Sequence, residues 1–184
     1  MREPPFLRPT STHRGFTLLE ALVVIGIVSV LVAAGYPAFN DLRQRREVGA
    51  KVSMLNSAIR RAKVEAVRRG RPVTLCPSSN TTDNLPVCGN AASNWAQGWV
   101  VFVDDGATRG VIDANETIIL VQTPFSGTGT ITNNNVAAMN FQATGLPMPP
   151  VQSTFTFTGD GSSGANPKYT KTMILSAQGR VTIP

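Results

Sequence analysis

The hydrophobic residues of this chain are concentrated in one uninterrupted run near its beginning. From Ala21 to Phe39 there are 19 consecutive residues without a charge, most of them Val, Ile, Leu and Ala. At about 1.5 Å per helical residue the run extends for about 28 Å, close to the hydrocarbon thickness of a bilayer. The pattern therefore predicts a membrane-spanning or targeting helix.

One charged residue, Glu20, stands at the amino-terminal edge of this run. A carboxylate inside the membrane border costs on the order of 2–3 kcal/mol, so an acid here indicates a functional role and a partner of opposite charge. The alternative is an ordinary secretory signal peptide, with small residues for a cut at 32–35 (VAAG). That alternative leaves Glu20 unexplained.

A second helical pattern, apolar on one face only, continues after Pro37. Its apolar residues recur at spacings of three and four, at Val48, Val52, Leu55, Ile59, Ala62 and Ala66. Gly70 followed by Pro72 ends the pattern, as a C-cap glycine and a proline do. The sequence thus predicts one helix from Phe16 to Arg69, about 80 Å long by its rise and kinked at Pro37.

Short apolar or alternating segments follow from residue 71 onward, separated by clusters of Gly, Asn, Ser, Asp and Pro. They predict antiparallel hairpins with strands at 72–76, 98–104, 117–122, 136–142, 153–158, 171–176 and 180–183. Residues 127–135 and 159–167 are expected to be the most flexible loops, and no second domain boundary follows Gly70. The predicted fold class is α+β, with the long kinked N-terminal helix packed on an antiparallel β-sheet domain.

The net charge of +6 is unevenly distributed along the chain. Residues 1–15 contribute +2, residues 16–71 contribute +6 and residues 72–184 contribute −2. The excess of Lys and Arg belongs to the helix, which argues against a generally nucleic-acid-binding domain. We expect these cations to form a solvated helix face. Acidic lipid headgroups near Arg43 to Arg46, acidic protein partners and nucleic acid are the alternatives.

Cys76 and Cys88 are the only cysteines, and they flank a polar loop of 11 residues. Such a pair indicates a disulfide and therefore an oxidising compartment. A zinc site would need further ligands, and the only histidine is His13, near the beginning of the chain. In the chain-entropy picture, a disulfide closing a loop of this size contributes about 3 kcal/mol to stability.

Residues suited to catalysis are scarce. Beyond His13 there is no histidine for a Ser–His, Cys–His or His-ligated metal site, and no glycine-rich phosphate loop occurs. Carboxylates that could act in a pair or bind calcium lie in one segment, at Asp104, Asp105, Asp113 and Glu116. Their spacing differs from an EF-hand, so we expect a plain hairpin with solvated acids and no catalytic residue, metal or cofactor. Trp95 and Trp99 are expected to pack in the core or at a strand edge rather than bind a partner.

Residues 14–20 (RGFTLLE) resemble the class III signal peptide of type IV pilins and type II secretion pseudopilins. The resemblance implies that a prepilin peptidase cuts between Gly15 and Phe16 and that Phe16 is then N-methylated. Pro37 stands where many pilins have a helix-kinking proline. Glu20 would be an assembly residue, because pairing with the Phe16 amine of a neighbouring subunit compensates two charges in the membrane.

Segments 62–70 (AKVEAVRRG), 72–77 (PVTLCP) and 98–104 (GWVVFVD) are similar to the FimT/GspH-type minor pilins, as is the closing Gly179-Arg180. The resemblance implies the pilin fold and a location in the inner membrane as a single-pass protein with a periplasmic domain, then in a pilus or pseudopilus filament. The implied parts are a leader at 1–15, a transmembrane and filament-core helix at 16–39, an amphipathic helix half at 40–70 and a globular β-rich domain at 71–184.

The same resemblance implies a minor pilin-like structural subunit of a type IV pilus that acts in filament assembly and priming. The resemblance also implies that the chain is not an enzyme and that its partners are other pilins, prepilin peptidase and the inner membrane. A type II secretion pseudopilin is the first alternative, although the run to Cys76-Pro77 is more typical of the pilus branch.

A DNA-binding pilin of natural transformation is the second alternative. The DNA-binding pattern of such relatives is Gly-Arg-x-Arg near the end, whereas this chain has Gly179-Arg180-Val181-Thr182 and lacks the second arginine. Lys168, Lys171 and Arg180 would provide only a weak contact to phosphates. DNA binding is therefore possible but not favoured.

Overall fold

The computed structural model describes residues 15–83, 85–90, 94–127, 129–134, 137–159 and 169–184, without the side chains of residues 37 and 38. The chain divides into two compact units, Met1–Asp41 and Leu42–Pro184. The leader expected at 1–15 lies outside the described residues except for Gly15, and Lys168 lies outside them as well.

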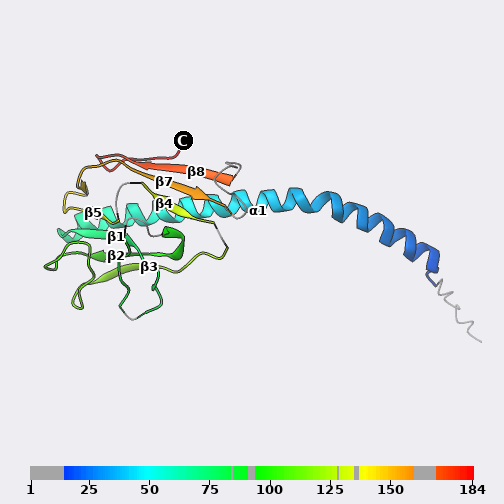
Figure 1. The fold of residues 1–184 in the computed structure, drawn as a ribbon, viewed down its shortest axis with the longest axis horizontal. Helices are drawn as coiled ribbons and strands as arrows, with labels where there is room; N and C mark the ends of the chain where they lie inside the picture. Colours follow the sequence, from blue (N-terminus) through cyan, green and yellow to red (C-terminus); the bar gives the residue numbers. More distant parts are fainter. Residues whose placement is uncertain (1–14, 84, 91–93, 128, 135–136, 160–168) are drawn as a thin grey trace, which may run out of the picture. The chain divides into compact units, whose positions relative to one another are not determined.

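A single long helix, α1 (Leu18–Arg69), belongs to both units (Figure 1). It begins two residues later than predicted, because Thr17 caps it. It ends as predicted, since Gly70 adopts φ +62° and its amide donates to the Val67 carbonyl at 3.3 Å. The backbone is helical at position 37, and the kink at Pro37 stays a prediction.

The second unit contains two antiparallel sheets. The larger has the order β3-β2-β1-β5-β6, and the smaller has the order β4-β7-β8-β9. The strands are β1 (Val73–Pro77), β2 (Trp99–Val103), β3 (Ile118–Gln122), β4 (Ile131–Asn133), β5 (Met139–Phe141), β6 (Pro147–Met148), β7 (Ser153–Thr158), β8 (Thr170–Leu175) and β9 (Val181–Thr182), with a short 3₁₀ helix η1 (Trp95–Gln97) before β2. In Figure 1, β1 to β3 lie on one side of the second half of α1, and β7 and β8 lie on the other.

The core forms between the helix stripe and both sheets. All six residues of the predicted stripe, from Val48 to Ala66, are buried. They belong to one apolar cluster with Leu75 of β1 and with Phe155 and Phe157 of β7. Since burying a large aliphatic or aromatic side chain stabilises the fold by about 1.5–3 kcal/mol, this cluster joins α1 and the two sheets into one domain.

Both tryptophans belong to this core. Trp95 lies edge-on to Phe155 with ring centroids 5.2 Å apart, and Trp99 lies 5.5 Å from the ring of Phe125. Because both indoles are almost completely buried, the prediction of core packing is confirmed.

The structure differs from the predicted strands in two respects. β4 lies within 127–135, which was expected to be a flexible loop, and β6 was not anticipated. That expectation is wrong for β4 because Ile131 is fully buried, pairs with Phe157 and donates its amide to Asn94 Oδ1 at 2.9 Å. The other predicted loop, 159–167, lies outside the described residues except for Gly159.

Candidate functional site

The predicted processing and assembly residues lie at the start of α1. Gly15 and Phe16 precede the helix and are exposed. Thr17 is the N-cap: its Oγ1 accepts a hydrogen bond from the amide of Glu20 at 3.2 Å, and its carbonyl accepts one from the amide of Ala21 at 3.1 Å. Glu20 itself is exposed in the first turn, where the helix dipole favours a negative charge.

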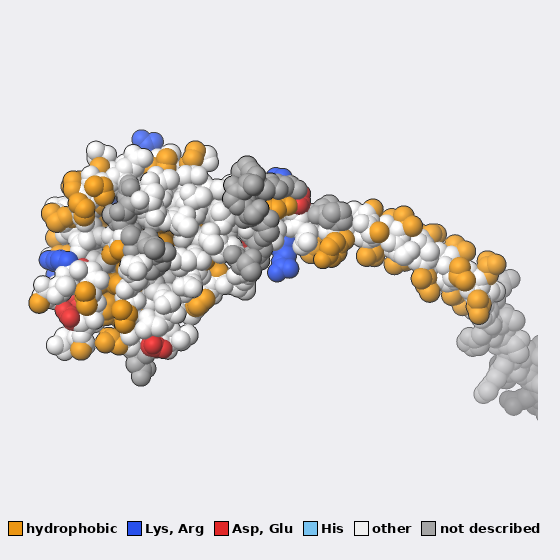
Figure 2. Space-filling model, in the orientation of Figure 1, with side chains coloured by type: hydrophobic (Ala, Val, Ile, Leu, Met, Phe, Trp, Pro, Cys, Tyr) orange, Lys and Arg blue, Asp and Glu red, His pale blue; other side chains and the backbone are white. Residues whose placement is uncertain are grey.

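The first part of α1 presents an apolar surface on every side. Large side chains from Leu18 to Phe39 are exposed in the first unit, as the orange residues along the helix in Figure 2 show. Among the described residues, α1 is the one helix long and apolar enough to cross a membrane, and its most apolar window is not buried at all. Such a surface needs lipid or other apolar helices around it, because water would leave it uncompensated.

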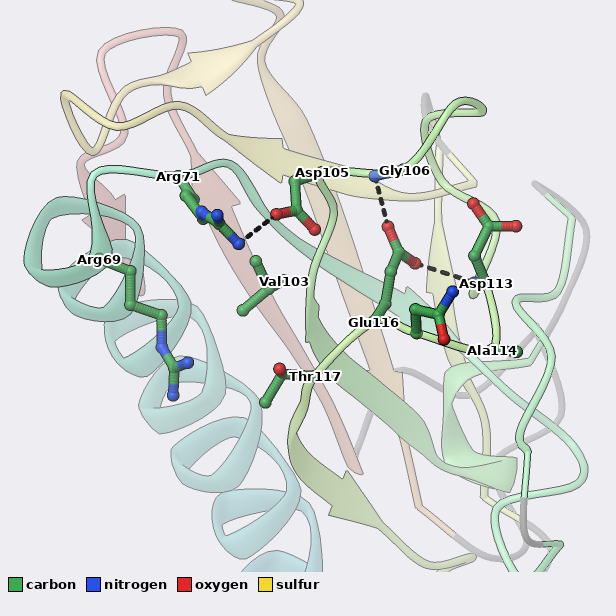
Figure 3. A pocket seen from close by; sticks show the side chains of 10 residues that line it. Arg69, Arg71, Val103, Asp105, Gly106, Asp113, Ala114, Glu116 and Thr117 are labelled. Atoms are coloured by element: carbon green, nitrogen blue, oxygen red, sulfur yellow. Dashed lines mark hydrogen bonds and ion pairs between the residues drawn. The ribbon is translucent and has the colours of Figure 1, made fainter.

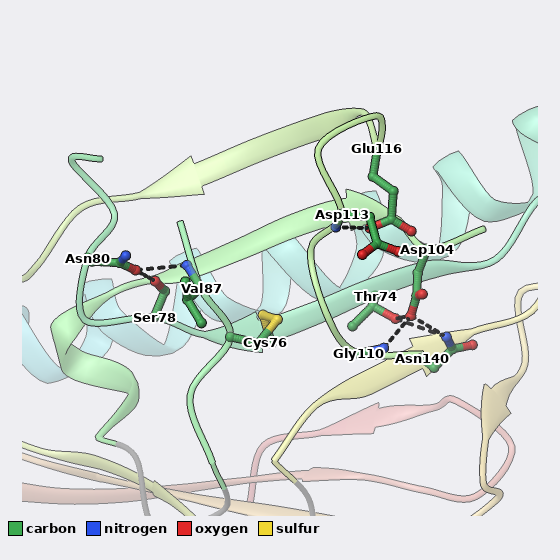
Figure 4. Close-up of a disulfide and its surroundings, with 11 residues drawn as sticks. Thr74, Cys76, Ser78, Asn80, Val87, Asp104, Gly110, Asp113, Glu116 and Asn140 are labelled. Carbon is green, nitrogen blue, oxygen red and sulfur yellow. Dashed lines mark hydrogen bonds between the residues drawn. A yellow bond between two sulfur atoms is a disulfide. The ribbon is translucent and has the colours of Figure 1, made fainter. Parts of the chain in front are cut away.

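The two cysteines are joined. Cys76 lies on β1, packed with Val100 and Phe102, and its disulfide to Cys88 closes the polar loop (Figure 4). Inside that loop, Asn80 Oδ1 accepts from the Ser78 hydroxyl at 2.9 Å and from the Val87 amide at 2.8 Å. The predicted disulfide is therefore present, and it holds a loop with its own internal hydrogen bonds.

The acidic segment between β2 and β3 does not form one cluster. Asp105 pairs with Arg71 at 2.5 Å, while Glu116 accepts from the amides of Gly106 at 2.8 Å and Asp113 at 2.9 Å (Figure 3). In the described part of the chain, no group of three His, Cys, Asp or Glu side chains could hold a metal ion. The two hydrogen bonds that Glu116 accepts hold the turn between β2 and β3 together.

Asp104 differs from the prediction of solvated acids in this hairpin. Its side chain is completely buried, so that interpretation is wrong for this residue. The reason is the set of donors that converge on its Oδ2: the Thr74 hydroxyl, the Gly110 amide and the Asn140 side-chain amide (Figure 4). A carboxylate in this position organises the sheet and the turn.

The cations proposed for DNA contact are not brought together. Lys171 lies at the start of β8, next to Arg45 and Tyr169. Arg180 lies in the turn between β8 and β9, where its amide donates to Ser176 Oγ at 3.1 Å. Since about five strand residues separate the two ends of β8, Lys171 and Arg180 stand about 17 Å apart along it. They do not form one phosphate-binding surface.

Two structural residues were not singled out from the sequence. Lys51 is buried beside Glu47 at 2.8 Å and lies 5.8 Å from the centre of the Phe125 ring. Its position three residues after Val48 places it on the apolar stripe, which is the signal that could have identified it. Asn94 Oδ1 caps η1 through the Ala96 amide and also accepts from Ile131, a contact between distant segments that no local pattern indicates.

Two family models match the chain. The model described as Type II transport protein GspH matches residues 52–179, which is more than half of the chain. The Prokaryotic N-terminal methylation motif matches residues 10–36 and thus includes Gly15, Phe16 and Glu20.

Curated relatives and solved structures agree with these matches. The Pilin-like protein PilA1 of Thermus thermophilus is 26% identical over 183 residues, which are 94% of this chain and 99% of that protein. The Type IV major fimbrial protein FimA of Dichelobacter nodosus is 41% identical over 44 residues, which cover 24% of this chain and 28% of that protein.

The crystal structure of the type IV minor pilin FimU of Pseudomonas aeruginosa has a TM-score of 0.57 at 19% identity, covering 78% of this chain and 92% of that chain. At that identity the likeness shows a shared fold. With the GspH match over most of the chain and PilA1 similar along nearly all of it, the resemblance to pilins is confirmed. The chain belongs to the GspH family of pilin-like proteins and is homologous to the type IV pilins.

Proposed function

We propose that this chain is a minor pilin-like structural subunit of a type IV pilus, which acts in filament assembly and priming and catalyses no reaction. The observation that carries the proposal is the contrast within α1. Its first part exposes large apolar side chains, whereas its second part buries a stripe of six residues in the core of its own domain. One part of the helix therefore serves the fold, and the other is available to lipid or to the helices of other subunits.

The start of α1 supports a role in assembly. A cut between Gly15 and Phe16 would leave an amine two residues before the first helical residue, and N-methylation would follow at Phe16. Glu20, exposed in the first turn, would then pair with the Phe16 amine of a neighbouring subunit. In the hydrocarbon, this pairing relieves two unfavourable charges at once and selects the register between subunits.

The same features support the proposed location. Before assembly, the apolar helix would cross the inner membrane once and the β-rich domain would lie in the periplasm, an oxidising compartment that suits the disulfide. Afterwards the helix would lie in the filament core. Prepilin peptidase and other pilins are the partners that this sequence of events requires.

A type II secretion pseudopilin is the second candidate, favoured by the GspH match over residues 52–179. A DNA-uptake pilin is a weaker candidate, because Lys171 and Arg180 lie near opposite ends of β8.

Deletion of the chain followed by three readouts tests these candidates. We expect surface piliation to be lost, protein secretion to continue, and complementation with the intact chain to restore pili. Loss of secretion with normal pili would overturn the proposal in favour of the pseudopilin. Loss of transformation with normal pili and normal secretion would favour a DNA-uptake role.

A further inference from the structure

A hollow with two unneutralised cations lies at the start of the second unit. It has a volume of about 230 Å³ and is lined by Arg45, Val48, Tyr169, Thr170 and Lys171. The first two residues come from α1 and the other three from the beginning of β8, more than 100 positions later in the sequence. Gly49 of α1 lies beside Lys171, since a Cβ added at this glycine would be in ordinary contact with the Lys171 ammonium, at 3.8 Å.

The charge around the hollow is positive. Arg43 and Arg46 flank Arg45 on α1, and these three side chains are exposed, as is Lys171. Within the described residues, none of the four is within 4.0 Å of an acid in an ion pair. The nearby acids on α1 are Asp41, which is engaged in an interaction of its own, and Glu47, which pairs with Lys51. In Figure 2, Lys and Arg side chains lie at this end of the second unit, with an acidic side chain near one of them.

The position of Arg45 along α1 indicates what this charge faces. Phe39 ends the uncharged run, and Arg45 follows six residues later on the same helix, about 9 Å further by the helical rise. The polar headgroup layer extends for about 5–8 Å beyond the hydrocarbon on each side of a bilayer. When the apolar run spans a membrane, the long side chain of Arg45 therefore reaches the headgroups.

The residue types in the hollow suit a phosphodiester. An arginine offers paired N–H donors to two phosphate oxygens, a lysine adds a compact positive charge, and tyrosine favours the membrane–water interface. Thr170, which carries a hydroxyl, also lines the hollow. The arrangement joins an arginine of the helix to a lysine of the sheet, so it exists only in the folded domain.

We propose that Arg45 and Lys171, with Tyr169 beside them, form a binding site for the headgroup phosphate of an anionic phospholipid. The site holds the folded domain against the membrane before the subunit enters a filament. This inference rests on the membrane residence proposed above, but not on the kind of filament that the subunit joins.

The test uses the full chain, solubilised in detergent and analysed by native mass spectrometry with phosphatidylglycerol or phosphatidylcholine of the same acyl chains. The intact protein should retain phosphatidylglycerol in preference. In the Arg45→Gln/Lys171→Gln variant the preference should fall about 25-fold, because each cation should contribute a factor of about five. The matched control is Arg60→Gln/Arg61→Gln, which removes two exposed arginines of α1 and should keep the preference.

Four outcomes would overturn the site. Equal retention of both lipids by the intact protein excludes headgroup recognition, and an equal loss in both double variants shows a general charge effect. Displacement of the lipid by inorganic phosphate at an equal concentration identifies the free anion as the ligand. Duplex DNA binding that is lost in Arg45→Gln/Lys171→Gln, while lipid preference is unchanged, assigns the cations to nucleic acid.

The failure of this inference is separable from a failure of the proposed function. If the chain enters pili normally and shows no lipid preference, only the headgroup site is excluded. If the lipid preference is present and the chain never enters a pilus, the proposed function fails and the site stands.

Discussion

The Thr74 hydroxyl donates a hydrogen bond to Asp104 Oδ2 at 2.5 Å, and both side chains are completely buried. The same carboxylate oxygen accepts from the Gly110 amide at 2.9 Å and from Asn140 Nδ2 at 3.1 Å. Through this one oxygen, β1, β5 and the turn after β2 are connected. The prediction of solvated acids missed this network because its members are far apart in the sequence.

Replacing Asp104 should destabilise the domain strongly. Asp104→Ala leaves the buried Thr74 hydroxyl and two half-buried amides, of Gly110 and Asn140, without their acceptor, and we expect a loss of about 3 kcal/mol in the free energy of unfolding. Asp104→Asn retains one acceptor oxygen and should lose less. Denaturant unfolding of the full chain in detergent measures both. Asp105→Ala is the matched control, because its partner Arg71 is exposed and the pair contributes at most about 1 kcal/mol. Equal unfolding of Asp104→Ala and Asp105→Ala would contradict the prediction.

Lys51 should contribute to the stability of the domain both by pairing with Glu47 and by packing its aliphatic chain in the core. Lys51→Ala removes the partner of Glu47 and empties space beside Phe125, so we expect about 3 kcal/mol of destabilisation. Lys51→Met combined with Glu47→Gln removes both charges and keeps the volume, and should remain within about 1 kcal/mol of the intact protein. Unfolding free energies of the intact protein and of both variants measure the difference. A double variant as unstable as Lys51→Ala would show that the ion pair itself stabilises the core.

The disulfide should stabilise the domain because it lowers the conformational entropy of the unfolded chain. Replacing Cys76 and Cys88 together by alanine frees a loop that the bond otherwise closes, with an expected loss of about 3 kcal/mol. Alanine suits position 76 because Cys76 is buried among apolar side chains. Thermal unfolding under oxidising and reducing conditions measures the effect: the reductant should destabilise the intact protein and leave the double variant unchanged. Val87→Ala, an exposed change in the same loop, should have little effect.

Glu65 should contribute to the acid sensitivity of the domain. Arg69 Nε donates to its Oε2 at 2.8 Å and Arg68 donates at 2.7 Å, and these bonds hold the pKa of Glu65 below its ordinary value of 4.5. A lowered pKa stabilises the folded state above the ordinary value, and this contribution is lost as the pH falls below 4.5 through the folded-state pKa. Glu65→Gln should therefore flatten the fall in stability below that pH. Unfolding midpoints across the acid range test this, and the effect should shrink when Arg69 is replaced by glutamine.

The local pattern of apolar and polar residues was sufficient to predict the helix and most of the strands. The stripe from Val48 to Ala66 repeats at the helical period and is buried as predicted, while Phe155 and Phe157 alternate with threonines on β7 and face the core. These predictions succeed because one face of each element is apolar along its own length.

Features that depend on contacts between distant segments could not be predicted in this way. β4 is three residues long, and its Ile131 is held by β7 and Asn94. The placement of Lys171 against Gly49 and of Arg180 in the turn after β8 follows from how β8 packs on α1, which composition does not encode. The cations near the end of the chain therefore looked like one group, and the fold separates them.

Glu20 should be required for entry into a filament and not for residence in the membrane. Glu20→Ala leaves the apolar run intact, and the hydrogen bond to Thr17 Oγ1 comes from the backbone amide of residue 20, so the helix should still begin at Leu18. The variant should fractionate with the membrane and be absent from sheared filaments. Glu65→Ala is the matched control, because that acid pairs with Arg68 and Arg69 of its own chain. If Glu20→Ala enters filaments as well as the control does, the carboxylate is not the partner of the Phe16 amine.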